Sequence, residues 1–89
     1  MRARALARRS EIRSVIKRLL YEDRREYVIM YRHRRDTGGE TLRPLKVYMI
    51  DRVDSWAIHL KDGFTTIPLH RVVEVRDEEG RVFWRRKGQ

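Results

Sequence analysis

The chain has 89 residues, of which 40% are hydrophobic, and it contains no cysteine. A chain of this length folds as one domain around a single small core, and the lack of cysteine excludes disulfides and thiolate metal sites. The 22 Lys and Arg outnumber the 13 Asp and Glu and give a formal charge of +9, which predicts a polyanionic partner, with nucleic acid as the first candidate.

Arginine accounts for 18 of the 22 basic residues, and its planar guanidinium binds phosphate at two points. Arginine-rich ion-pair surfaces of proteins from high growth temperatures, or codon bias, are alternative causes of the same excess. No apolar stretch approaches the roughly 20 residues that span a bilayer, and the basic start of the chain lacks the apolar segment of a signal peptide. We therefore expect a soluble, cytoplasmic protein without a membrane partner.

The chain is expected to begin with a basic arm at residues 1–9, followed by a single folded domain at residues 10–87. The sequence leaves open whether the arm is helical or disordered. An amphipathic helix is predicted to follow, with Ser10 as its cap and Glu11 near its positive end. The apolar residues of this helix recur at helical spacing and are Ile12, Val15, Ile16, Leu19 and Leu20.

After residue 26 the hydrophobic period changes from about 3.6 to 2, which predicts β-strands. Turns are expected at "DTGGE", at "KDG", where Gly63 can take a positive φ, and at "RDEEG". Pro68 cannot donate a backbone hydrogen bond, so "IPL" is predicted to be an edge, a bend or a short turn. The predicted strand segments are residues 27–35, 45–50, 55–60, 64–75 and 81–86.

These elements predict an α+β protein in which one helix packs on an antiparallel meander of five to six strands, since no second helix is available for a parallel crossover. Such a sheet can curl into a small, partly open barrel. The three histidines, His33, His59 and His70, lack metal-ligand spacing, and no glycine-rich nucleotide loop is present. The sequence therefore predicts neither a metal site nor a cofactor.

The segment "IPLHR" is the strongest local candidate for chemistry, because Pro68 fixes the backbone ahead of His70 and Arg71, two side chains that can donate to one anion. From this segment alone, a structural His70 that faces water or bonds a carbonyl is favoured. Aromatic residues interleaved with Arg along the strands indicate either a surface that stacks bases or core packing. Phe83 and Trp84 must face opposite sides of their strand, and the sequence does not say which faces the core.

The segments "IPLHRVVEV" (67–75) and "GRVFWRR" (80–86), together with "YRHR" (31–34), resemble a family of small uncharacterised archaeal proteins that carry the RNA cyclic group end recognition domain. The resemblance covers residues 10–86 and implies recognition, or processing, of RNA ends that bear a 2′,3′-cyclic phosphate. The positions that match the family are Tyr31, Arg34, Pro68, His70, Arg71, Trp84 and Arg85.

The leading hypothesis is an RNA-binding module for phosphorylated RNA 3′ ends. In it, His70 and Arg71 bind the phosphate with help from Arg34 and Arg85, and Pro68 positions them. The terminal base is stacked by Trp84 or Tyr31.

One alternative is an RNA-end-processing enzyme that opens the cyclic ester with His70 as acid or base, and we lean against it. Such a reaction also needs a second proton-transfer group, which His33, His59 or a carboxylate would have to supply. Another alternative is a basic protein-interaction or ribosome-associated domain. The sequence leaves the natural RNA, protein partners and oligomeric state open.

Overall fold

The computed structural model describes the backbone of residues 8–87 and the side chains of residues 11–87. Within residues 8–87 it contains one helix, seven strands and two short 3-10 turns, which confirms the α+β class. The elements are α1 (Arg8–Tyr21), β1 (Val28–Arg34), β2 (Glu40–Lys46), η2 (Val47–Met49), β3 (Ile50–Val53), β4 (Ala57–Leu60), β5 (Thr66–Pro68), η3 (Leu69–Arg71), β6 (Val72–Arg76) and β7 (Val82–Arg85).

The described part of the helix runs from Arg8. Ser10 is therefore itself helical, and the expectation that it precedes and caps the helix was wrong. The last two residues of the predicted basic arm are helical, whereas residues 1–7 lie outside the described part of the chain.

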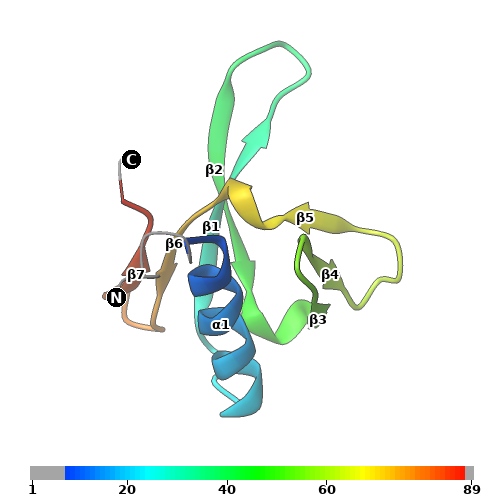
Figure 1. Ribbon diagram of the computed structural model, residues 1–89. Helices are drawn as coiled ribbons and strands as arrows, with labels where there is room; N and C mark the ends of the chain where they lie inside the picture. The colour runs from blue at the N-terminus through cyan, green and yellow to red at the C-terminus, as the bar shows by residue number, and fades with distance from the viewer. Residues whose placement is uncertain (1–7, 88–89) are drawn as a thin grey trace.

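The strands form two antiparallel sheets (Figure 1). The large sheet has the order β2-β1-β6-β7, and the small sheet has the order β3-β4-β5. The single meander was wrong, because β1 pairs with β6 across the whole small sheet. Neither sheet closes, so the suggested barrel is not confirmed. Figure 1 also shows the β1–β2 hairpin extending beyond the rest of the molecule.

Two 3-10 turns explain why the predicted strands were too few. The segment 45–50 was expected to be one strand, but β2 ends at Lys46 and the turn η2 directs the chain into the small sheet. The segment 64–75 is likewise divided, because β5 ends at Pro68 and the turn η3 returns the chain to the large sheet. The break predicted at Pro68 is therefore present, and it separates strands of two sheets.

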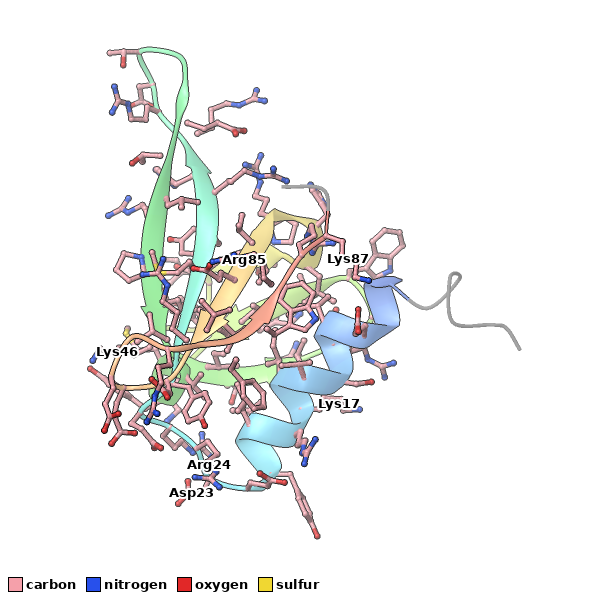
Figure 2. The ribbon with its side chains drawn as sticks, turned by 90° about the vertical axis from the view of Figure 1, so that its left-hand side faces the viewer. Lys17, Asp23, Arg24, Lys46, Arg85 and Lys87 are labelled. Carbon is pink, nitrogen blue, oxygen red and sulfur yellow. The ribbon has the colours of Figure 1, made fainter. Side chains whose placement is uncertain are left out.

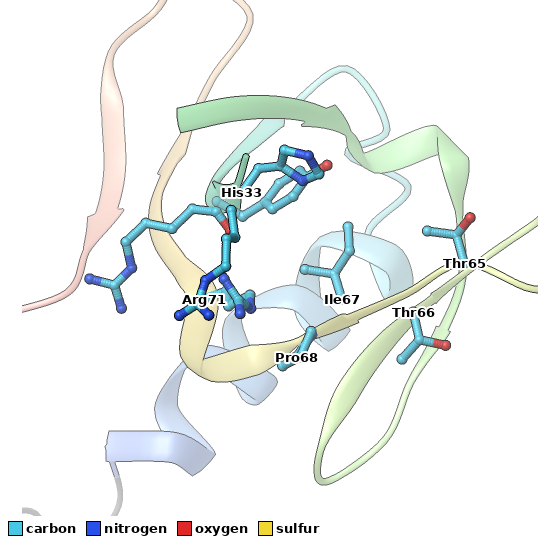
Figure 3. Close-up of a pocket in the computed structure, with 9 residues that line it drawn as sticks. His33, Thr65, Thr66, Ile67, Pro68 and Arg71 are labelled. Carbon is cyan, nitrogen blue, oxygen red and sulfur yellow. The ribbon is translucent and has the colours of Figure 1, made fainter. Parts of the chain in front are cut away.

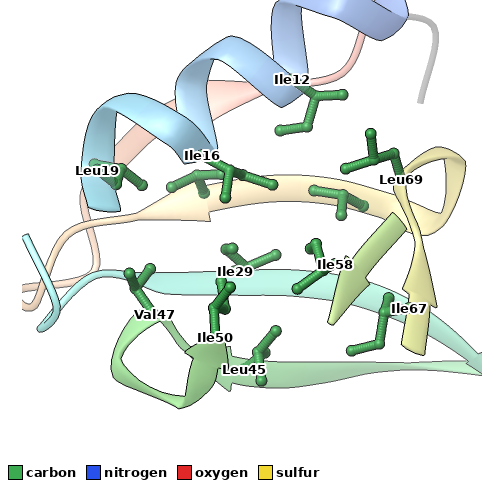
Figure 4. Close-up of a cluster of buried hydrophobic side chains, with 12 residues drawn as sticks. Ile12, Ile16, Leu19, Ile29, Leu45, Val47, Ile50, Ile58, Ile67 and Leu69 are labelled. Atoms are coloured by element: carbon green, nitrogen blue, oxygen red, sulfur yellow. The ribbon is translucent and has the colours of Figure 1, made fainter. Parts of the chain in front are cut away.

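One hydrophobic core joins the helix to both sheets (Figure 4). The predicted helical stripe supplies Ile12, Ile16 and Leu19, all at most 1% exposed, while Val15 and Leu20 pack at its margin. Strands and 3-10 turns supply the other buried residues, which are Ile29, Leu45, Val47, Ile50, Ile58, Ile67, Leu69, Val72 and Val75.

Asp54 organises the connection between β3 and β4. Its Oδ1 accepts hydrogen bonds from the backbone N–H groups of Trp56 and Ala57, each at 2.8 Å, and its Oδ2 lies 2.7 Å from Nε2 of His59. The hydrogen bond with His59, followed by the two backbone hydrogen bonds, lowers the pKa of Asp54 from 3.8 to about 2. The ionised form of Asp54 is therefore favoured in the folded protein.

Acid unfolding should reveal this interaction. Because the folded pKa of Asp54 is depressed, the stability it provides is fully present above pH 4 or so and is lost as the pH falls toward about 2. Asp54→Asn should therefore lower stability at neutral pH and show a smaller further loss between these two pH values, as measured by urea unfolding. Asp36→Asn, in the β1–β2 turn, controls for the removal of one carboxylate, and an acid profile of Asp54→Asn parallel to the wild type would contradict the prediction.

Candidate functional site

A pocket of about 320 Å³ opens between the end of β1 and strand β5 (Figure 3). Figure 3 shows His33 of β1 facing a wall formed by β5 and the residue before it, with Arg71 at one end of the pocket. Both sheets contribute, so the pocket exists only where the large and small sheets pack together. The lining residues are Tyr31, Arg32, His33, Arg34, Thr65, Thr66, Ile67, Pro68 and Arg71.

The wall on β1 carries two rings. Strand alternation places Tyr31 and His33 on the same face as the buried Ile29, and the two rings meet edge to face with their centroids 6.5 Å apart. Tyr31 also packs against the core. Its ring position is thereby fixed, and His33 extends the aromatic surface outward into the pocket.

The opposite wall is held by the β4–β5 turn. Asp62 accepts hydrogen bonds from the backbone N–H groups of Phe64 and Thr65 at 2.9 and 2.8 Å and from the Thr65 hydroxyl. The hydroxyl bond, followed by the backbone bonds, lowers the pKa of Asp62. Gly63 has a φ of +88°, as the "KDG" signal predicted. This turn positions Thr65 at the pocket.

The turn η3 places Arg71 at the end of the pocket. Pro68 precedes η3 in an extended conformation with φ −59° and ψ 140°, which proline adopts readily. Nη1 of Arg71 donates to the carbonyl of Arg32 at 3.4 Å, and Nη2 of Arg32 donates to the carbonyl of His70 at 3.2 Å. Arg71 and Arg32 therefore tie η3 to β1 from both directions.

A third guanidinium holds η3 from the end of the large sheet. Arg86 donates from Nε to the carbonyl of Val72 at 2.8 Å and from Nη2 to the carbonyl of Leu69 at 2.9 Å. Burial, and then the charge of Arg32, lower the pKa of Arg86. The fold thus gathers arginines around η3 despite their mutual repulsion, an arrangement that an anion would stabilise.

The pocket concentrates positive charge without a carboxylate in its lining. Within residues 11–87, neither Arg34 nor Arg71 forms an ion pair. Seven arginines of the described part differ, because each of them lies within 4 Å of an acidic side chain. These paired arginines are Arg18, Arg24, Arg25, Arg52, Arg76, Arg81 and Arg85.

The structure brings together four of the seven residues proposed from the sequence. Tyr31, Arg34, Pro68 and Arg71 line the pocket. His70 is exposed on η3 beside Arg71, and its side chain is not part of the lining.

Trp84 and Arg85 lie elsewhere, on β7. Trp84 pairs with Val75 near the far end of β6 from Arg71, packs against the core and has the Arg86 guanidinium 5.5 Å from its ring centroid. Phe83 is 46% exposed, and its ring meets the Tyr27 ring edge to face with the centroids 5.3 Å apart. Arg85 donates to Glu74 at 2.6 and 2.8 Å. Trp84 and Arg85 are therefore separated from the pocket by the register of β7 on β6.

Sequence reasoning did not assign His33, Arg32, Thr65 or Thr66 to the site. The two-residue spacing of Tyr31 and His33 on a strand was a usable signal, because it places both rings on one face. The threonines gave no such signal, since their position depends on how the two sheets pack.

Two properties of the described residues concern metals and membranes. Between residues 8 and 87 no group of three or more His, Asp or Glu is placed to hold a metal ion. Over the same stretch, α1 is neither long nor apolar enough to cross a bilayer.

Comparison with known proteins identifies relatives of the chain. The family model described as the MJ1316 RNA cyclic group end recognition domain matches residues 4–86. A UPF0248 protein from Aeropyrum pernix is 48% identical over 82 residues, which cover 89% of this chain and 81% of the relative. No solved structure matches the chain. The resemblance carried by "IPLHRVVEV" and "GRVFWRR" is thereby confirmed, and the chain belongs to the family of the MJ1316 RNA cyclic group end recognition domain.

Proposed function

We propose that this protein binds RNA by its phosphorylated 3′ end, with the terminal phosphate in the pocket and a 2′,3′-cyclic phosphate as the preferred group. The observation that carries the proposal is a pocket lined by three arginines and a histidine with no carboxylate. Phosphate binds such sites through charge-assisted hydrogen bonds. The description of the family, which names recognition of RNA cyclic group ends, supports the same ligand.

The pocket also has room for more than a phosphate. Its volume of about 320 Å³ falls within the range of small-molecule sites, and its apolar wall of Ile67 and Pro68 suits a ring better than an ion. We assign Arg71 and Arg34 to the phosphate and the His33 ring to contact with the terminal nucleoside. His70, exposed on the same turn, is assigned a contact at the rim.

Binding is favoured over catalysis by the lining itself. Opening a cyclic phosphate normally uses two proton-transfer groups. The described residues that line the pocket include one imidazole, His33, and no carboxylate, and the second imidazole, His70, lies at the rim outside this lining. We therefore place recognition, and no bond cleavage, at this site.

The proposal is tested with short oligonucleotides that differ only at the 3′ end, as cyclic phosphate, linear phosphate or hydroxyl, using fluorescence anisotropy. The cyclic end should bind most tightly. Arg71→Gln should weaken its binding by roughly 10- to 100-fold, the effect of one charged hydrogen bond, and should remove the preference among ends.

Arg18→Gln is the matched control, because Arg18 lies on α1 with its side chain 69% exposed and paired to Glu22. It should bind all three ends as the wild type does. The proposal fails if the three ends bind alike in the wild type, or if the two arginine variants lose affinity equally.

A further inference from the structure

The outer face of the large sheet is open to solvent, opposite the face that packs on the core. Ile29 pairs with Leu45 and Val75 on the inner face. The neighbours of Ile29 on β1 therefore point outward, as does every second residue from them. The residues that pair with these on β2 and β6, and the residues of β7 that pair with the outward residues of β6, share the same face. The cationic side chains of this outer face are Arg32, Arg34, Lys46, Arg76 and Arg85.

The outer face presents more positive charge than its composition indicates. Two carboxylates belong to it, Glu40 opposite Arg34 and Glu74 opposite Arg85. The Glu74 side chain is only 7% exposed, beneath Arg76 and Arg85 side chains that are 39% and 61% exposed. Nitrogen–oxygen distances of 2.6 Å fix both guanidiniums over this acid. Solvent therefore meets ordered cations, and the carboxylate that orders them is covered.

Apolar side chains lie between these cations. Met30 is half-buried and pairs in register with the exposed Pro44, and the next outward residue of β2, Leu42, is 47% exposed. Flat surfaces that alternate apolar side chains with Arg and Lys suit single-stranded nucleic acid, whose bases pack while its phosphates meet the cations.

The outer face and the pocket share a border. Arg32 points outward from β1, and its Nη2 donates to the carbonyl of His70 on η3, the turn that carries the pocket residue Arg71. Arg34 also belongs to both surfaces. A chain whose end occupies the pocket would therefore reach the outer face with its next residues.

We propose that the outer face of the large sheet binds the single-stranded RNA that precedes the terminal nucleotide, an inference that rests on the proposed function. The pocket orients the end, and the outer face adds sequence-independent contacts with upstream phosphates. Affinity should then depend on RNA length and salt, whereas discrimination among 3′ ends belongs to the pocket.

The experiment compares uridine 2′,3′-cyclic phosphate with a hexanucleotide that carries the same 3′ end, by calorimetry at several salt concentrations. The hexanucleotide should bind more tightly, and its salt dependence should steepen by about 0.7 for each additional phosphate contact. Lys46→Glu should weaken hexanucleotide binding by roughly 10-fold and reduce its salt slope, with the mononucleotide unaffected. Lys17→Glu, on α1 across the sheet from Lys46 (Figure 2), should change neither ligand.

Each contrary outcome has one reading. The inference is overturned if Lys46→Glu and Lys17→Glu weaken the hexanucleotide equally, or if the hexanucleotide gains nothing over the mononucleotide while the end preference persists. A polyglutamate peptide that competes as well as RNA would also overturn it, in favour of an acidic protein. If all 3′ ends bind alike and Lys46→Glu still weakens the hexanucleotide, the outer face binds RNA and it is the proposed function that fails.

Discussion

Replacing both Arg76 and Arg85 by methionine should lower the free energy of unfolding by about 3 to 5 kcal/mol at neutral pH, the typical cost of a buried charge left without a partner. Methionine keeps an unbranched, mostly apolar side chain above Glu74, which is 7% exposed, but it offers no hydrogen bond. Burial raises the pKa of Glu74, and the hydrogen bonds from Arg85 and Arg76 outweigh this, so the pKa is lowered in the wild type. Without these hydrogen bonds, burial alone acts on Glu74 and should raise its pKa.

The loss of stability in this double variant should depend on pH, because the protonation of Glu74 differs between the variant and the wild type. In the wild type, the lowered pKa means that Glu74 contributes stability above the pKa of the unfolded chain and loses it in acid. In the double variant the pKa of Glu74 is raised, so its destabilisation should shrink as the pH falls from 7 toward about 4. Urea unfolding at both pH values measures the difference.

Two further variants separate burial from charge. Arg81→Met removes two pairs of an arginine that is itself 76% exposed, one with Glu79 at the same 2.6 Å distance and one with Asp77 at 3.3 Å, and exposed pairs are worth about 0 to 1 kcal/mol each. Adding Glu74→Met to the double variant should restore most of the lost stability, since a fully apolar replacement leaves no unpaired charge. Equal losses in the Arg81 variant and the double variant would contradict the account.

Truncating Ile58 to alanine should cost about 2 to 5 kcal/mol of stability, the usual range for a large buried aliphatic side chain. Ile58 is 0% exposed on β4, pairs with Ile67 of β5 and belongs to the core that joins both sheets. Because β5 forms one wall of the pocket, affinity for RNA ends should fall together with the melting temperature.

The matched substitutions are Ile58→Val, expected to cost about 0.5 to 1.5 kcal/mol, and Leu42→Ala on an exposed position of β2, expected to change stability by about 0.5 kcal/mol or less. Thermal unfolding of the three variants provides the ranking. A cost for Leu42→Ala as large as that for Ile58→Ala would show that burial does not govern the difference.

The helix was predictable because its information is local. The 3.6-residue spacing identified Ile12, Ile16 and Leu19 as core residues, and all three are buried. The break at Pro68 was also local, since the missing N–H acts wherever proline stands. The second partner of β1 was not predictable in this way, because β6 lies beyond the entire small sheet in the sequence and the pairing depends on tertiary packing.

The residues of the candidate site also differ in whether local sequence or tertiary packing places them. Pro68 and Arg71 were found because they lie three residues apart in one motif, whereas His33 enters the pocket from a strand more than thirty residues earlier. The prediction that Phe83 and Trp84 face opposite ways assumed regular alternation, which the register shift between Val75 and Arg76 interrupts at Phe83. Only the pairing of Trp84 with Val75 decides that the tryptophan faces the core.

The hydrogen bonds around η3 also determine whether the motif "IPLHR" can keep its conformation in another protein. Its carbonyl groups are held by Arg32 from β1 and Arg86 beyond β7, neither of which is part of the motif. A synthetic peptide of this segment, or a loop of the same sequence grafted onto another scaffold, would lack both braces and would not keep the Arg71 geometry. The geometry of Arg71 therefore depends on the arrangement of the strands that place Arg32 and Arg86, and the motif alone does not determine it.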